Sequence, residues 1–80
     1  MATRQVMFTF PTGLIKEPLI FQLGVKFNLL PNIRRADITE SKGWVVLELE
    51  GREKDIEAGI AWLKDKGIRV DPVTGDILEG

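Results

Sequence analysis

Apolar and polar residues alternate at the start of the chain. In residues 4–10, Val6, Phe8 and Phe10 share one face, and this period of two, with β-branched and aromatic side chains, is typical of a half-buried strand. Residues 11–13, Pro-Thr-Gly, are turn formers that end it.

The period then becomes helical. Residues 16–30 carry apolar side chains at helical spacing: Leu19 or Ile20, Leu23, Phe27 and Leu30. Pro18 suits a first helical turn, where its missing N–H is not needed, and Pro31 stands just past the predicted end. We therefore expect a helix over most of this segment.

Two further alternating segments predict a hairpin. Residues 32–40 place Ala36 and Ile38 on the core side, and residues 44–50 place their own apolar set there, with the turn Ser41-Lys42-Gly43 between them. The inward residues of the second segment are Val45, Leu47 and Leu49.

The last third of the chain predicts a helix and a strand. In residues 52–66 the inward positions are Ile56, Ile60 and Leu63. Gly67 is a helix stop in the left-handed conformation, and a last strand follows at residues 68–70.

The resulting order of strand, helix, strand, strand, helix, strand predicts an α+β fold. It is the ferredoxin-like βαββαβ sandwich, with a four-stranded antiparallel sheet and two helices on one face. We expect one domain over residues 4–71 and a tail over residues 72–80, which forms a further short strand or an arm. The open face of the sheet is predicted to carry Met7, Thr9, Ile33, Arg35, Asp37, Trp44, Val46, Glu48 and Arg69.

The composition of the chain excludes several classes of functional site. The 80 residues include no cysteine and no histidine, which excludes disulfides, thiolate zinc sites, iron–sulfur ligation and a Ser-His-Asp triad. The first ten residues do not have the pattern of a signal peptide, and no segment has the roughly 20 apolar residues of a membrane span. We therefore expect a cytoplasmic protein without membrane insertion.

Lys42-Gly43-Trp44 resembles the start of an RNA-recognition signature, in which a basic residue and a glycine precede stacking aromatics. The two aromatic positions of that signature are here Trp44 and Val46, so only one matches. Glu48 follows on the same face, and the net charge of −1 is not that of a phosphate binder. Nucleic acid is therefore not expected as a partner.

No catalytic group is apparent in the sequence. The carboxylates of residues 52–66 are interleaved with lysine and arginine, which is typical of a solvated, salt-bridged helix face. Acylphosphatases share the predicted fold and use an arginine after the first strand, where this chain has Pro-Thr-Gly. We expect no enzymatic activity and no cofactor.

Asn32 and Ile33 are the most suggestive remaining pair. An amide at the junction of helix and strand can both donate and accept, as an amino-acid ligand requires. From chemistry alone, a turn or cap residue is the favoured interpretation of Asn32. Arg34 and Arg35 could contact an anion, but basic residues on an edge strand more often prevent aggregation.

The chain resembles the NIL domain, the C-terminal regulatory module of methionine-importing ABC transporter ATPases, which also occurs in small proteins, some fused to iron–sulfur modules. The resemblance runs from about Arg4 to Val70. Its most telling parts are Pro18-Leu19, Asn32-Ile33, the segment 47–51 (Leu-Glu-Leu-Glu-Gly) and Lys66-Gly67-Ile68. In the Asn-Ile-Leu motif that names the family, Arg34 stands at the third position.

The resemblance implies a sheet-mediated homodimer and, as in the transporter members, methionine bound near the dimer interface. By position it makes Asn32, Ile33 and Arg34 the ligand-site candidates. A transporter or an iron–sulfur protein is the implied partner. The dimer would use the edge of the second strand or the open face, whose relevant residues are Met7, Ile33, Arg35, Trp44 and Val46.

Two functions therefore remain open. The first is a non-catalytic sensor of a small molecule, with an amino acid such as methionine as the ligand. The second is a protein–protein interaction module without a ligand. RNA binding is a distant third.

Overall fold

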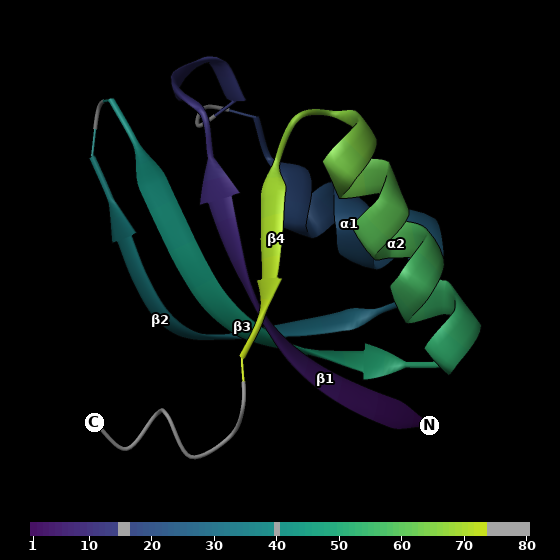
Figure 1. The fold of residues 1–80 in the computed structure, drawn as a ribbon. Helices are drawn as coiled ribbons and strands as arrows, with labels where there is room; N and C mark the ends of the chain where they lie inside the picture. The colour runs from purple at the N-terminus through teal and green to yellow at the C-terminus, as the bar shows by residue number, and fades with distance from the viewer. Residues whose placement is uncertain (15–16, 40, 74–80) are drawn as a thin grey trace.

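One antiparallel sheet contains all four strands of the computed structural model, which describes residues 1–14, 17–39 and 41–73 (Figure 1). The strand order is β2-β3-β1-β4. The elements are β1 (Ala2–Phe10), a 3-10 turn η1 (Thr12–Leu14), α1 (Leu19–Phe27), β2 (Leu30–Ile38), β3 (Gly43–Gly51), α2 (Glu53–Asp65) and β4 (Arg69–Pro72). The predicted ferredoxin-like βαββαβ arrangement is confirmed.

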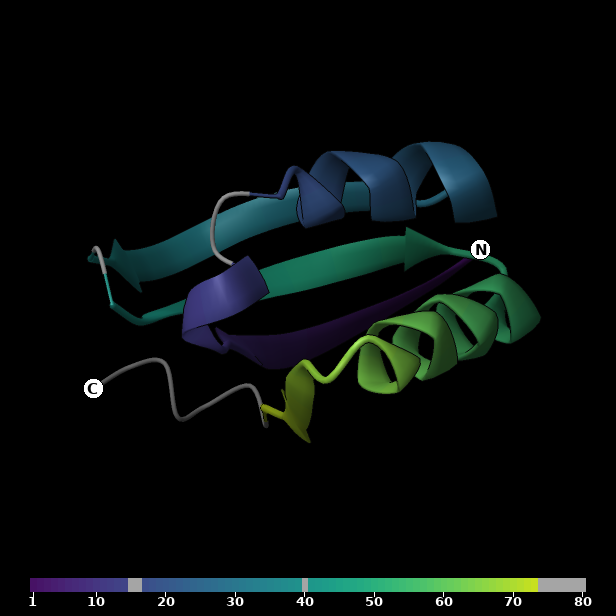
Figure 2. The ribbon, with the colours of Figure 1, turned by 90° about the horizontal axis from the view of Figure 1, so that it is seen from above.

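The core lies between one face of the sheet and the two helices. Its strand residues are the predicted alternating positions, and they are at most 7% exposed: Val6, Phe8, Phe10, Val45, Leu47 and Leu49. The helices contribute Leu19, Leu23, Ile56 and Leu63. Ile60 is only half-buried and packs at the margin of this cluster, as does Trp62. Figure 2 shows α1 on the β2 side of the molecule and α2 on the side of β1 and β4.

The first helix is shorter than the apolar spacing predicts. It ends at Phe27 because Asn28 adopts a left-handed conformation, with φ of 57°, and the Leu29 N–H donates to the Gly24 carbonyl at 2.9 Å. Leu29 is therefore the buried residue after the helix. Leu30, predicted to face inward, begins β2 and is 61% exposed.

The second strand starts earlier than predicted and contains a β-bulge. Pro31, which was expected to lie outside regular structure, is its second residue, a position that an edge strand tolerates. Ile33 pairs with Leu47 and Arg35 with Val46, so Arg34 is the extra residue. The prediction that Ile33 lies on the open face is wrong, because the bulge reverses the alternation upstream of Arg34 and directly paired side chains share a face.

The outer part of the helix-facing side is not covered. Ala36 and Ile38 pair with Val45 and Gly43, and so lie on the predicted side of the sheet. Both are nevertheless exposed, Ile38 to 56%. α1 contacts only the start of β2, where Pro31 is half-buried, and α2 packs on β1, β3 and β4, so the rest of β2 stays exposed.

The helix stop and the last strand lie where the sequence predicts them. Gly67 has φ of +94°, a conformation that favours glycine, directly after α2. β4 ends at Pro72, and the Val73 N–H donates to the Gln5 carbonyl at 3.1 Å, so the start of the predicted tail still pairs with β1. The further strand or arm expected beyond it falls on residues 74–80, outside the described residues.

Leu47→Ala is expected to lower the free energy of unfolding by about 2–5 kcal/mol, because Leu47 is fully buried at the middle of β3 and truncation leaves a cavity. The exposed Leu30 is the control, and Leu30→Ala should cost less than about 1 kcal/mol. Denaturant unfolding measures both values. Equal losses in the two variants would contradict the assignment of the core face.

Candidate functional site

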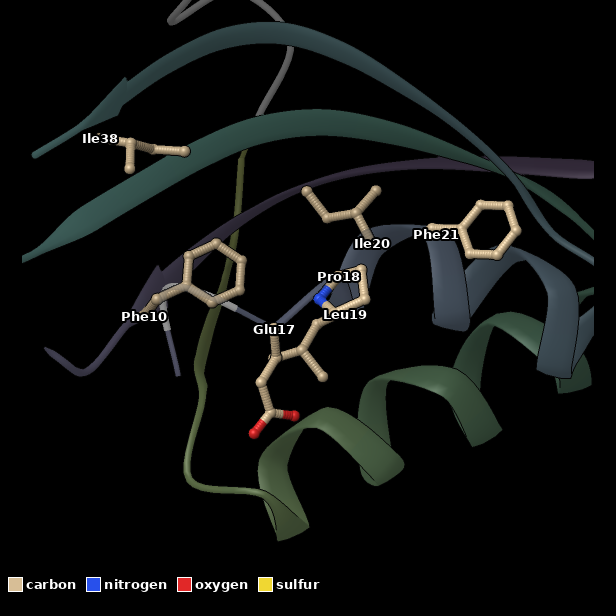
Figure 3. A pocket seen from close by; sticks show the side chains of 7 residues that line it. All are labelled: Phe10, Glu17, Pro18, Leu19, Ile20, Phe21 and Ile38. Atoms are coloured by element: carbon tan, nitrogen blue, oxygen red, sulfur yellow. The ribbon is translucent and has the colours of Figure 1, made fainter. Parts of the chain in front are cut away.

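An apolar slot opens where α1 begins. It has a volume of about 160 Å³ and is lined by Phe10, Glu17, Pro18, Leu19, Ile20, Phe21 and Ile38 (Figure 3). The lining comes from three elements that are distant in sequence: the end of β1, the first turn of α1 and the end of β2. We call this cavity the apolar slot.

The start of α1 is held by backbone hydrogen bonds. The Leu19 N–H donates to the Glu17 carbonyl at 2.8 Å, and the Gln22 N–H donates to the Pro18 carbonyl at 3.0 Å. Leu19 is buried at the base of this turn, while Phe21 is 69% exposed at the rim. The slot is smaller than the roughly 300–1,000 Å³ of sites for drug-sized ligands. Its size and lining suit one apolar side chain, and Glu17 places a carboxylate beside it.

A row of polar side chains crosses the open face of the sheet. Glu48 of β3 pairs with Asn32 of β2 on one side and with Gln5 of β1 on the other. The Arg34 guanidinium lies 4.0 Å from the Glu48 carboxylate. We call these residues, Gln5, Asn32, Arg34 and Glu48, the polar row.

The polar row has unused hydrogen-bonding capacity. The Gln5 Oε1 atom is buried and has no hydrogen-bond partner among the described residues. The Arg34 and Glu48 side chains are 46% and 31% exposed, so their contact contributes little stability and can be exchanged for a ligand. A guanidinium and a carboxylate side by side match the two charges of an amino-acid zwitterion.

The three ligand candidates do not lie together. Asn32 and Arg34 are both in the polar row, whereas Ile33 is on the opposite face. The apolar slot is at the other end of β2: Ile38 is six residues from Asn32, which is about 20 Å along a strand. The sequence pattern did not predict the apolar slot. The adjacent apolar pair Leu19-Ile20 could have indicated it, because the core needs only one of the two residues.

The exposed apolar surface also differs from expectation. On the open face, Met7 and Trp44 are half-buried and Val46 is only 7% exposed, while Arg35 is exposed. Large apolar side chains that are more than half exposed occur instead mainly on β2 and α1, as Phe21, Val25, Leu30, Ile33 and Ile38. Of the two predicted surfaces, the edge of the second strand therefore carries the more accessible apolar area.

Trp44 lies in surroundings unsuited to base stacking. Its cross-strand neighbours are Asp37 and Thr9, and the described part of the open face has no second aromatic side chain. Glu48 and Glu50 add negative charge on that face. The Trp44 ring is half-buried among these neighbours rather than presented as a platform.

Comparison with known proteins decides the family. The model of the NIL domain matches residues 4–72. The chain belongs to the NIL domain family. A solved structure described as the C-terminal domain of an ABC transporter ATP-binding protein from Enterococcus faecalis is similar, with a TM-score of 0.79 and 20% sequence identity. The match covers 90% of this chain and 84% of that one, and at this identity it supports the fold. No curated protein sequence matches the chain.

The NIL domain is a family of regulatory domains. Residues 1–14, 17–39 and 41–73 contain no helix long and apolar enough to cross a membrane. Within the same ranges, no three acidic side chains gather as they would around a metal ion.

Single-stranded RNA is expected to leave the Trp44 indole N–H resonance unchanged, because the acidic side chains of the open face repel phosphate. The measurement is a titration with an oligouridine in low-salt buffer, followed by two-dimensional NMR. The Trp62 resonance, on the helical side, is followed in the same spectra to tell binding at the open face from binding elsewhere. A shift confined to Trp44 that weakens steeply with added salt would contradict this expectation.

Proposed function

We propose that this NIL domain is a regulatory module that binds an amino acid such as methionine where two copies of the chain meet. The observation that carries the proposal is the geometry of β2. Most of this edge strand is exposed, and its open face carries the ligand candidates Asn32 and Arg34 beside the exposed Leu30.

Pairing between two copies of β2 is the simplest way to cover the strand. An edge strand presents unpaired backbone groups, and β2 adds Leu30, Ile33 and Ile38, each more than half exposed. Because antiparallel strands run in opposite directions, pairing would bring the Asn32 end of each β2 beside the Ile38 end of the other. Each site would then combine Asn32 and Arg34 of one chain with open-face residues of the partner's β2, while the apolar slot would lie on the other, helix-facing side of the joined sheet.

A methionine zwitterion suits such a composite site. Its charged head needs hydrogen-bond partners, and its thioether tail needs apolar contact, which Leu30 offers on the same face as Asn32. Asn32 can both donate and accept, and Arg34 can pair with the carboxylate. If Arg34 does not pair with the carboxylate, it weakens binding instead. An unpaired charge against apolar surface costs at least as much free energy as one charged hydrogen bond contributes.

The second candidate is an interaction module without a ligand. The ion pair between Arg34 and Glu48 favours it, because each charge already has a neighbour of opposite sign 4.0 Å away. The partner would be a transporter subunit or an iron–sulfur protein in the cytoplasm, and β2 would pair with that protein instead of with a second copy. The experiments below distinguish the two candidates.

A homodimer is expected at high micromolar concentration, because pairing of β2 removes its exposed apolar side chains from water. Ile33→Glu should shift the population towards monomer, since it places a charge on the paired edge. Ala58→Glu, at an exposed position of α2, is the matched control and should leave the dimer intact. Sedimentation velocity gives the masses. A strictly monomeric wild type would contradict the dimer and the composite site together.

Methionine is expected to bind weakly, with a dissociation constant of roughly tens of micromolar or poorer, because the gain and the penalty at Arg34 nearly balance. Asn32→Ala should abolish binding, and Arg34→Leu should strengthen it. Arg52→Leu, an exposed arginine outside both sites, should have no effect. Isothermal titration calorimetry measures the affinity, with alanine as the ligand that lacks the tail.

The absence of heat with both the wild type and Arg34→Leu would reject the amino-acid sensor. If millimolar methionine produces no heat and no chemical-shift change with the wild type or with Arg34→Leu, the interaction module replaces it. Equal affinities for methionine and alanine would instead show that the thioether tail makes no contact with the protein.

A further inference from the structure

Large apolar side chains are exposed on the outer side of α1, whereas the outer side of α2 is mainly charged. Phe21 and Val25 lie one turn apart on α1 and are 69% and 68% exposed. The exposed positions of α2 are charged residues and alanines. Gln22 and Lys26 lie on the same side, but a surface helix normally keeps large apolar side chains such as Phe21 and Val25 on its buried face.

A groove between the two helices continues this surface. It has a volume of about 560 Å³ and is lined by Phe21, Gln22, Val25, Lys26, Trp62 and Lys66. Trp62 is half-buried in it, with its ring 5.6 Å from that of Phe27. The groove thus offers a fixed aromatic surface beside the two exposed apolar residues of α1.

The charge of the groove has one sign. Its lining includes Lys26 and Lys66 and no carboxylate, although the chain as a whole has a net charge of −1. The Lys66 ammonium lies 4.9 Å from the centre of the Trp62 ring, so a positive group is held next to the apolar surface. An occupant that complements this groove carries carboxylates next to a bulky apolar side chain.

We propose that the groove between α1 and α2 is the docking site for an acidic amphipathic helix of a partner protein. Its apolar face would cover Phe21, Val25 and Trp62, and its carboxylates would pair with Lys26 and Lys66. This site does not depend on the ligand site proposed above, because neither lysine nor Trp62 lines the apolar slot.

The charges favour this occupant over two others. A second copy packed through α1 would bring two lysines together without an acid, since α1 contains no carboxylate. An anionic membrane is flat, whereas the groove is a concave space between two helices with only two lysines, in a chain of negative net charge.

The test uses a pair of synthetic peptides of roughly 15 residues, long enough to form helix on binding. One carries leucines at helical spacing flanked by glutamates, and the other has lysine in place of each glutamate. Two-dimensional NMR of the full chain follows the two tryptophan indole N–H resonances. We expect the acidic peptide to shift Trp62, in the groove, and to leave Trp44, on the open face, unchanged.

Charge reversal supplies the matched controls. Lys26→Glu combined with Lys66→Glu should weaken the acidic peptide about tenfold or more and admit the basic one. Lys54→Glu combined with Lys64→Glu changes the net charge equally outside the groove and should change the affinity little. Phe21→Ala should also weaken binding, and thermal unfolding confirms that each variant is folded.

Four outcomes would overturn the proposal. The first is no Trp62 shift at millimolar acidic peptide. The second is equal weakening by both charge-reversed pairs. The third is a Trp62 shift that depends on protein concentration without peptide, which would make a second copy the occupant. The fourth is a Trp62 response to phosphatidylglycerol vesicles but not to the peptide, which would indicate a membrane.

Discussion

Burial of one face of β1 and β3 under two helices is the constraint on which the rest of the molecule depends. Val6 and Phe8 of β1 and Leu47 and Leu49 of β3 are almost completely removed from water there. At about 25 cal/mol for each Å² of apolar surface buried, such side chains supply most of the stability of a small domain. The remaining elements pack around this core, and part of their own apolar surface stays exposed to solvent.

The surface left over is concentrated on β2 and α1. β2 pairs only with β3, and the described helices leave its side chains exposed apart from Pro31, which is half-buried beside α1. α1 has only nine residues, and it uses Leu19 and Leu23 for the core while Phe21 and Val25 point away from it. Because the core is small, it leaves both a strand edge and an apolar helix surface exposed.

These two surfaces suit two kinds of ligand. The edge of β2, with the polar row on its open face, matches the small amphiphilic ligand that we propose. The basic groove between α1 and α2 matches a larger acidic element. Phe21 lines both this groove and the apolar slot, so an occupant of one can change the position of a side chain in the other.

Local pattern determined most of the architecture. The alternation of residues 4–10 and 44–50, the helical spacing of 52–66 and the turn signals at Gly43 and Gly67 are short-range features, and they give the order of elements and the central core correctly. The edge strand was predicted less well. Pairing along β2 slips at Arg34, and no local signal marks the slip.

That slip decides the arrangement of the candidate site. It turns Ile33 towards the helices and sends Asn32 and Arg34 to the open face beside Glu48. The left-handed Asn28 likewise ends α1 one turn before the apolar spacing does, and the strand that follows begins at Leu30. By itself, the sequence determined the fold and its core, because periodic burial needs only local spacing. Only the tertiary structure decided which side chains share a face, a slot or a groove, because that depends on the register between strands and on where the helices stop covering the sheet.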